Sequence, residues 1–301
     1  MNIALIATGG TIGGRRSADG VIKLNPAATE QIRAIIDAKT VIDDVTLHSE
    51  SMDFADMFKL YGAVKRALET NPDGIIITHG TDGIAFSSAY LAYAFCGAKT
   101  PIVMCSADLP LNEPASNGFD ILQAAKTFIM QRKSGVYVIF KNPGFTPTVH
   151  HGARILPALL HENKYYSIGG DCSFVDGGLM RGLDFDIAGN KVLCILPYVG
   201  LDYAAFDVRG YSAVLHSSYR SGAVNAAKFN AFAAAHPDIP MFLTAGRKRY
   251  VDQVFEKNIT LCYGITYSAL YVKIMIGLKN NVKDLAAFVG KNACGEIIEK
   301  Y

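Results

Sequence analysis

Long apolar runs are missing from this sequence of 301 residues. No stretch approaches the roughly 18 uninterrupted apolar residues that a membrane-spanning helix needs. At the N-terminus an apolar run covers only residues 3–7 before the first glycines, and no basic residue precedes it. The sequence therefore predicts neither a signal peptide nor a membrane span, and we expect a cytoplasmic protein with no membrane partner.

Paired cysteines and an excess of one charge are also missing. The formal net charge is +2, and the longest run of basic residues covers only 247–249. We therefore expect no nucleic-acid partner. None of the six cysteines belongs to a CxxC pair, and most lie in apolar runs, so we expect free thiols in a reducing compartment rather than disulfides or metal ligands. They are Cys96, Cys105, Cys172, Cys194, Cys262 and Cys294.

The length is typical of two domains, and half of the residues are hydrophobic, as in a globular protein. Continuous apolar runs predict strands that are buried on both faces. Between these runs, apolar residues recur every three or four positions over 57–68 and 121–129, which predicts helices. The predicted strands cover 3–7, 74–78, 101–105, 135–140, 191–196, 211–215 and 240–244.

Alternating strands and helices predict an α/β fold with a mostly parallel sheet. The alternation breaks over residues 142–190, which contain glycine pairs and little regular period. We place the domain boundary in this stretch. The sequence thus predicts a doubly wound, flavodoxin-like N-terminal catalytic domain over 1–180 and a smaller α/β domain over 190–301.

Two short threonine-bearing turns are the most informative feature of the sequence. One covers residues 8–14 and the other 78–83, and each directly follows a predicted strand. Both turns would lie at the carboxyl edge of the sheet, where open α/β folds bind ligands. They could simply cap the next helix, bind a phosphate, or form a catalytic site. Thr8 stands where a dinucleotide fingerprint needs glycine, which disfavours the phosphate alternative.

The catalytic interpretation gives each part of the turns a role. A threonine hydroxyl becomes a nucleophile when a base removes its proton and backbone N–H groups stabilise the developing oxyanion. Glycines in the first turn allow the main chain to approach a substrate closely. Asp82 in the second turn supplies a fixed negative charge for a substrate ammonium, and helix N-termini favour a substrate carboxylate. We therefore predict a site for a small polar molecule.

These turns look like the two signature segments of the bacterial-type L-asparaginase/glutaminase family, in a shorter branch of it. The resemblance spans nearly the whole chain. It implies hydrolysis of L-asparagine to L-aspartate and ammonia through an acyl-threonine intermediate, without a metal or cofactor. It also implies a homodimer or homotetramer in which a neighbouring subunit completes each active site. The similar segments are 8–12, 49–52, 78–82, 116–118, 214–222 and 267–273.

The resemblance also implies roles for individual residues. Thr11 matches the nucleophile that attacks the side-chain amide, and Thr81 matches a second catalytic threonine near which water is activated. Asp82 matches a group that acts beside Thr81 and, together with Glu50, holds the substrate's α-ammonium. Ser49 matches the group that holds the α-carboxylate. The remaining predicted substrate-binding residues are the turn glycines Gly10 and Gly80.

The sequence departs from the family pattern at two places. The family has a lysine that assists the second threonine, and that position falls on His150 or His151, or on Pro157 in another alignment. We predict that His150 takes this role, since a neutral histidine can act as a base. Where many members carry a tyrosine near the first threonine, this chain has Val21, and a tyrosine from elsewhere, such as Tyr219, would have to substitute.

Three other functions stay open at this point. The substrate could be glutamine or another amino-acid amide or lactam. The missing lysine and tyrosine would also fit a catalytically silent amino-acid-binding protein. A nucleotide-binding α/β protein is the third alternative, and the absent first glycine disfavours it.

Overall fold

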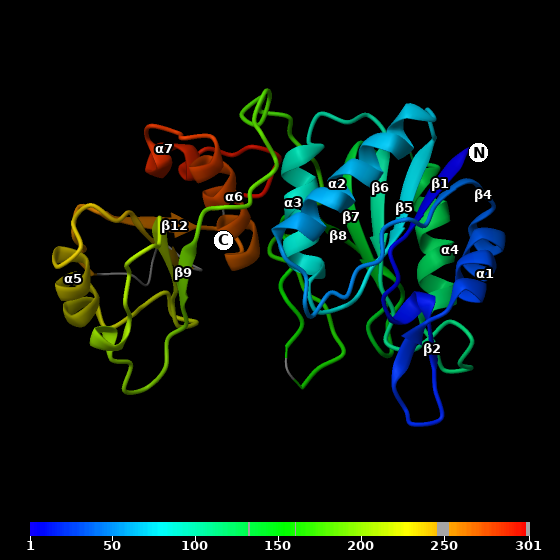
Figure 1. Cartoon of the computed structure of the whole chain (residues 1–301), viewed down its shortest axis with the longest axis horizontal. Coiled ribbons are helices and arrows are strands. Elements are labelled where there is room, and N and C mark those ends of the chain that lie inside the picture. Colours follow the sequence, from blue (N-terminus) through cyan, green and yellow to red (C-terminus); the bar gives the residue numbers. More distant parts are fainter. Residues whose placement is uncertain (132, 160, 246–252, 299–301) are drawn as a thin grey trace.

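The structure, a computed structural model, describes residues 1–131, 133–159, 161–245 and 253–298. The basic run at 247–249 lies outside the described residues. Two larger sheets form the framework of the structure, with helices packed around them (Figure 1). No helix among the described residues is long and apolar enough to cross a membrane.

The first sheet has six strands in the order β4-β1-β5-β6-β7-β8. All neighbours are parallel except β7 and β8. The first five positions follow the flavodoxin order 2-1-3-4-5, with β1 and β5 at the point where the winding direction reverses. This confirms the predicted fold class. The strands are β1 (Ile3–Ala7), β4 (Ala38–Ile42), β5 (Gly74–Thr78), β6 (Pro101–Cys105), β7 (Gly135–Phe140) and β8 (Thr148–His151).

Helices cover both faces of the first sheet (Figure 1). α1 packs against α4, and α2 packs against α3. Local signals fix where they begin: the Asn25 side chain caps α1 with proline at its first position, and Asp53 and Asp56 form a capping box at the start of α2. The helices are α1 (Pro26–Ile36), α2 (Phe54–Glu69), α3 (Ile84–Ala94) and α4 (Gly118–Ile129).

The second sheet has four strands, all parallel, in the order β12-β11-β10-β9. Its helix α6 packs against α3 of the first sheet, which explains why α3 is apolar almost all round. The domain boundary between 180 and 190 stays a prediction. The elements are β9 (Val192–Ile195), β10 (Ala213–Ser217), β11 (Met241–Ala245), β12 (Ile259–Tyr263), α5 (Ala226–Ala234), α6 (Tyr267–Lys279) and α7 (Leu285–Gly290).

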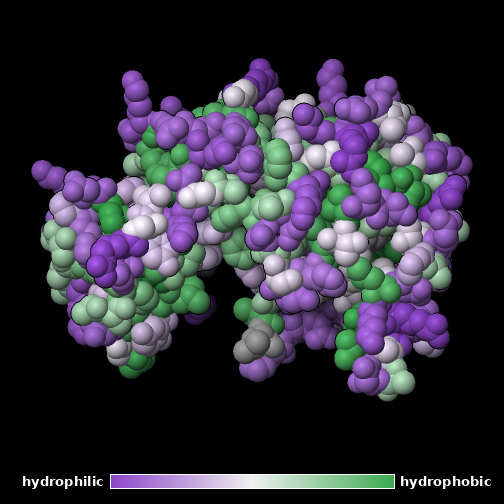
Figure 2. Space-filling view, viewed as in Figure 1, coloured by the Kyte–Doolittle hydropathy of each residue, from purple (hydrophilic) through white to green (hydrophobic). Residues whose placement is uncertain are grey.

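All seven predicted strands are present within about two residues of their predicted bounds, and both predicted helices are present as α2 and α4. Among the strands of the two larger sheets, β4, β8 and β12 were not predicted. A short antiparallel hairpin, β2 (Gly14–Arg16) and β3 (Ile22–Leu24), follows the 3-10 turn η1 (Thr11–Gly13). On the face shown in Figure 2, hydrophilic and hydrophobic side chains are interspersed.

Candidate active site

The two threonine turns meet at the carboxyl edge of the first sheet. β1 and β5 pair directly, with Ala7 opposite Thr78, so the turns that follow them emerge side by side. Thr11 begins η1, and Thr81 lies just before α3. In open α/β sheets, ligands bind in the crevice formed where the winding direction reverses, which is between these two strands.

A cavity of about 190 Å³ lies between the turns. Thr11 and Thr81 both line it, and both are half-buried. The structure therefore brings together seven of the eight predicted site residues. The lining residues are Gly10, Thr11, Ile22, Leu24, Leu47, His48, Ser49, Glu50, Gly80, Thr81 and Asp82.

Glycine is required at two positions of this cavity. Gly10 has φ 72°, a conformation that side chains other than glycine rarely adopt, and a Cβ atom there would overlap the carbonyl of His79 in the other turn. A Cβ atom on Gly80 would overlap the hydroxyl of Ser49. The main chains of the two turns and the segment around Ser49 are thus in direct contact, which fixes the relative positions of the threonines.

Hydrogen bonds hold the same three segments. Thr8 donates its hydroxyl to the Thr78 carbonyl, and the Leu47 N–H donates to the Thr8 carbonyl over 2.9 Å. On the other side, the Tyr165 hydroxyl donates to the Thr81 carbonyl over 2.7 Å. These bonds position the main chain of the cavity independently of any ligand.

The cavity is acidic. Asp82 and Glu50 line it, and no lysine or arginine is among the described residues that do so. The Glu50 carboxylate lies 3.9 Å from His48 Nδ1 and is largely exposed. Two carboxylates beside hydroxyls and glycine main chain fit a small ligand that carries an ammonium group.

The structure does not bring His150 into this cavity. His150 lies on β8, where its Nδ1 is 3.1 Å from the Ser167 hydroxyl and its Nε2 has no hydrogen-bond partner among the described residues. Burial lowers its pKa to about 4, so the ring is neutral near pH 7. Neither His151 nor Pro157 lines the cavity. His151 is also neutral, since burial lowers its pKa to about 4, and its Nε2 is 3.1 Å from the Cys294 carbonyl.

Neither of the two residues considered for the missing tyrosine, Val21 and Tyr219, lines the cavity. Val21 is 52% exposed, in the connection between β2 and β3. Tyr219 lines a different cavity, at the second sheet. The histidine of the second turn, His79, is fully buried, with Nδ1 2.8 Å from the Gly80 carbonyl. Its bond therefore stays within the turn.

Sequence reasoning missed Tyr165, whose hydroxyl bonds to the Thr81 carbonyl, and Asp108, which lies at the same edge of the sheet. Tyr165 comes from the irregular stretch 152–190, so no periodicity could have located it. Asp108 lies three residues after the end of β6, and a carboxylate shortly after a predicted strand was a usable signal. Burial raises the pKa of Asp108 to about 6.

A wider groove of about 470 Å³ continues from the cavity. The two share Ser49, Glu50 and Asp82. The groove has mainly apolar walls, which come from α2, α3, α6 and the segment just before α2. They include Met52, Phe54, Met57, Phe86 and Tyr271.

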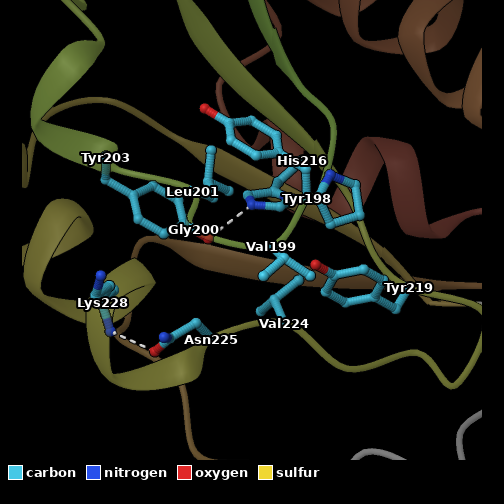
Figure 3. Close-up of a pocket in the computed structure, with 11 residues that line it drawn as sticks. Tyr198, Val199, Gly200, Leu201, Tyr203, His216, Tyr219, Val224, Asn225 and Lys228 are labelled. Atoms are coloured by element: carbon cyan, nitrogen blue, oxygen red, sulfur yellow. Dashed lines mark hydrogen bonds between the residues drawn. The ribbon is translucent and has the colours of Figure 1, made fainter.

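The second sheet has a cavity of about 270 Å³ at its own carboxyl edge (Figure 3). Its described lining includes three tyrosines and Lys228 but no carboxylate or threonine. His216 is fully buried there, with Nε2 2.8 Å from the Tyr203 hydroxyl and Nδ1 2.6 Å from the Ser217 carbonyl. Both ring nitrogens of His216 therefore have hydrogen-bond partners within the protein.

The sequence matches a known family over half of its length. Residues 2–156 match the family described as "Asparaginase, N-terminal". The chain belongs to the asparaginase family. The match covers β1 to β8 and hence both threonine turns.

Individual relatives agree with this assignment. The L-asparaginase of Thermococcus kodakarensis is 31% identical over 149 residues, which are 46% of this chain and 44% of that protein. A glutamyl-tRNA(Gln) amidotransferase subunit of Methanopyrus kandleri is 32% identical over 170 residues, 51% of this chain and 36% of that protein. The matches thus span less than half of these relatives.

Solved asparaginases share the fold of the whole chain. The thermostable L-asparaginase from Thermococcus kodakarensis has a TM-score of 0.78 at 22% identity, and the comparison covers 100% of both chains. The second sheet, which the family match does not reach, is therefore part of the same overall architecture. No group of three or more metal-ligating side chains occurs among the residues that the structure describes.

Proposed function

We propose that this asparaginase-family amidohydrolase converts L-asparagine and water into L-aspartate and ammonia through an ester on Thr11. One observation carries the proposal: Thr11 and Thr81 line a single cavity of about 190 Å³ together with two carboxylates. A nucleophilic hydroxyl, a second hydroxyl for the attacking water and anionic groups for an ammonium are thereby gathered in one place.

In the first half of the reaction, the Thr11 oxygen attacks the carbon of the side-chain amide. Backbone N–H groups near Gly10 and Thr81 stabilise the negative charge on the amide oxygen. The amide C–N bond then breaks, the leaving nitrogen takes up the proton that the Thr11 hydroxyl gave up, and ammonia leaves, so that an acyl ester remains on Thr11. In the second half, water attacks this ester next to Thr81 and releases the acid.

Substrate recognition follows from the charges of the cavity. Asp82 and Glu50 hold the α-ammonium, and Ser49 holds the α-carboxylate close to the N-terminal end of α3. The contact between Gly80 and Ser49 places this polar group at a fixed distance from Thr81. Free amino-acid amides fit this arrangement of groups.

Two alternatives have specific support. The wider groove beyond Asp82 leaves room for glutamine or a larger amide. Because neither a lysine nor His150 is among the described residues that line the cavity, a silent amino-acid-binding protein is the other alternative. The homodimer or homotetramer, the site contribution from a neighbouring subunit and the cytoplasmic location remain predictions.

Ammonia release from the purified protein tests the proposal. We expect turnover of L-asparagine, with slower release from L-glutamine and from the D-forms of both. Thr11→Ala should abolish release and leave the circular dichroism spectrum unchanged. Calorimetric binding of L-aspartate without any ammonia release would favour the silent alternative, and activity retained by Thr11→Ala would remove Thr11 from its role.

A further inference from the structure

The groove of about 470 Å³ beside the cavity has no role in the hydrolysis of free asparagine. We propose that it binds the second residue of a short peptide whose N-terminal residue is asparagine, and that this second residue is apolar. The side-chain amide of the asparagine is hydrolysed and the peptide bond stays intact. This inference rests on the proposed hydrolysis and names a substrate class for the same site.

The groove meets the cavity at the end that binds the α-carbon of the substrate. The two share Ser49, Glu50 and Asp82, the residues to which we assign the α-ammonium and the α-carboxylate. Thr11 and Thr81 line the cavity but not the groove. A bound asparagine therefore has its amide at the threonines and its α-carbon at the mouth of the groove, so that a substituent on the α-nitrogen or on the α-carboxyl carbon enters the groove.

The charges at this junction decide between the two substituents. Glu50, Asp53 and Asp82 line the cavity or the groove, and no lysine or arginine is among the described residues that line either. These carboxylates attract an α-ammonium and repel an α-carboxylate. A peptide bond at the α-carboxyl carbon removes the repelled charge and keeps the ammonium, whereas acylation of the α-nitrogen removes the ammonium. The charges therefore favour asparagine at the N-terminus of a peptide.

The walls of the groove present aromatic rings from three helices. Tyr271 of α6 packs edge-on against Phe86 of α3, with ring centroids 5.8 Å apart. Phe54 of α2 stacks on Tyr271 from 6.1 Å. All three rings line the groove and are only half-buried, so each keeps surface that a ligand can cover. Rings that hold one another in place fit an apolar or aromatic side chain.

The reaction consumes one water and releases one ammonia for each peptide. The Thr11 oxygen bonds to the side-chain amide carbon, the C–N bond breaks, and the leaving nitrogen takes up the proton that the Thr11 hydroxyl gave up. Water then bonds to the ester carbon and gives one proton to the Thr11 oxygen as the bond between them breaks. The product is the same peptide with aspartate in place of asparagine.

Dipeptide probes test the proposal by steady-state kinetics of ammonia release. Asparaginyl-phenylalanine N-methylamide and asparaginyl-glycine N-methylamide have no free carboxylate, and their caps can release only methylamine. We expect kcat/KM to be about 10- to 100-fold higher for the phenylalanine peptide, because its ring leaves water for the groove. Phenylalanyl-asparagine has no α-ammonium on its asparagine and should react at least about tenfold more slowly than free asparagine. Mass spectrometry identifies the aspartyl product.

A variant of the groove wall separates groove binding from general reactivity. Phe86→Ala should lower the preference for the phenylalanine peptide to less than about threefold and leave kcat/KM for free asparagine within about twofold. Phe86→Leu, a smaller change, should also lower the preference and keeps the test decisive if Phe86→Ala does not fold. The matched control is Phe58→Ala, since Phe58 stacks on Tyr61 and does not line the groove, and it should keep the wild-type preference.

Three results would overturn the inference and leave the proposed function standing. One is equal kcat/KM for the two capped peptides, which would fit a groove covered by a second copy of the chain. Another is a wild-type preference in both Phe86 variants. The third is release from phenylalanyl-asparagine as fast as from the capped phenylalanine peptide. Absence of ammonia release from asparagine and from every peptide would instead overturn the proposed function.

Discussion

The carboxyl edges of the two sheets carry different chemistry, although parallel strands build both. At the first sheet, the turns after β1 and β5 contribute threonines, glycine main chain and carboxylates to one cavity. At the second sheet, the corresponding cavity is lined by tyrosines, valines and a histidine whose two nitrogens are already bonded (Figure 3). A parallel sheet therefore supplies the place for a site, and the connecting segments decide whether it can react.

A second difference concerns buried charge. The part of the chain around the second sheet contains a fully buried ion pair, in which Lys273 of α6 lies 2.5 Å from Glu296. Burial alone would raise the pKa of Glu296, but the Lys273 charge and the N–H of Cys294 outweigh it and lower that pKa. At the first sheet, Glu50 and Asp82 line a cavity, whereas here a carboxylate joins the C-terminal segment to a helix.

The largest expected effect is a loss of activity that occurs in variants of the first cavity but not in a variant of the cavity at the second sheet. Thr11→Ala and Thr81→Ala each remove a hydroxyl from the first cavity, so ammonia release should fall by about 10,000-fold or more. Lys228→Ala changes the cavity at the second sheet and should leave kcat within about twofold. Loss of activity in Lys228→Ala with an intact fold would show that the second cavity takes part in the reaction.

The buried ion pair predicts the next largest effect, on stability. Lys273→Met leaves Glu296 buried without its partner, so the free energy of unfolding should fall by about 3–5 kcal/mol. Lys279→Met, on the same helix, breaks a partly exposed pair with Asp184 and should cost less than about 1 kcal/mol. Urea denaturation measures both, and equal losses would show that burial of the pair does not matter.

Two glycines of the first turn, Gly10 and Gly13, test whether the main-chain contact between the two turns matters for activity. Gly10→Ala introduces a Cβ atom that overlaps the His79 carbonyl, which moves the backbone donors and should lower kcat by about 100- to 1000-fold. Gly13→Ala, in the same turn, meets no atom within 4 Å and should leave kcat within a few-fold. Comparable losses in both variants would mean that flexibility of the turn, rather than its contact with the second turn, sustains activity.

The sequence was a reliable guide to the interior of each sheet and a poor one to its edges. β1, β5, β6 and β7 are almost wholly buried, so their residues form the continuous apolar runs from which they were predicted. Of the four edge strands of the two larger sheets, β4, β8 and β12 were missed and β9 was predicted, and neither strand of the β2–β3 hairpin was predicted. An edge strand has less burial and tolerates polar residues, as the Thr-Val-His-His sequence of β8 shows.

The site divides in the same way. Thr11, Thr81 and Asp82 were found because each follows a strand that the sequence reveals, and register then places them together. His150 was assigned by counting along a stretch in which the sequence did not reveal strand β8, so its register with β7 could not be used. Tyr165 lies in that stretch too, and its contact with Thr81 depends on 84 intervening residues folding as they do. Only the structure could show that Tyr165 contacts the Thr81 main chain and that His150 does not line the cavity.

Acid should weaken the first sheet through its buried histidines. Burial lowers the pKa of His79, His150 and His151 to about 4, whereas an unfolded histidine titrates near 6.5. Below pH 6.5 the unfolded chain therefore binds protons that the folded chain does not, and the free energy of unfolding falls as the pH falls. From pH 7.5 to 6 the loss is about 0.8 kcal/mol for each histidine, or roughly 2.5 kcal/mol together.

The raised pKa of Asp108 opposes this trend, but its contribution to the free energy of unfolding is smaller than that of the histidines. Its folded pKa of about 6 lies above the unfolded value of 3.8, so acidification stabilises the folded state, by only about 0.4 kcal/mol between pH 7.5 and 6. The net change should remain a loss. Urea midpoints at the two pH values measure it, and His150→Asn should reduce the pH dependence by about a third. A midpoint that rises on acidification would mean that these histidines are protonated in the folded protein.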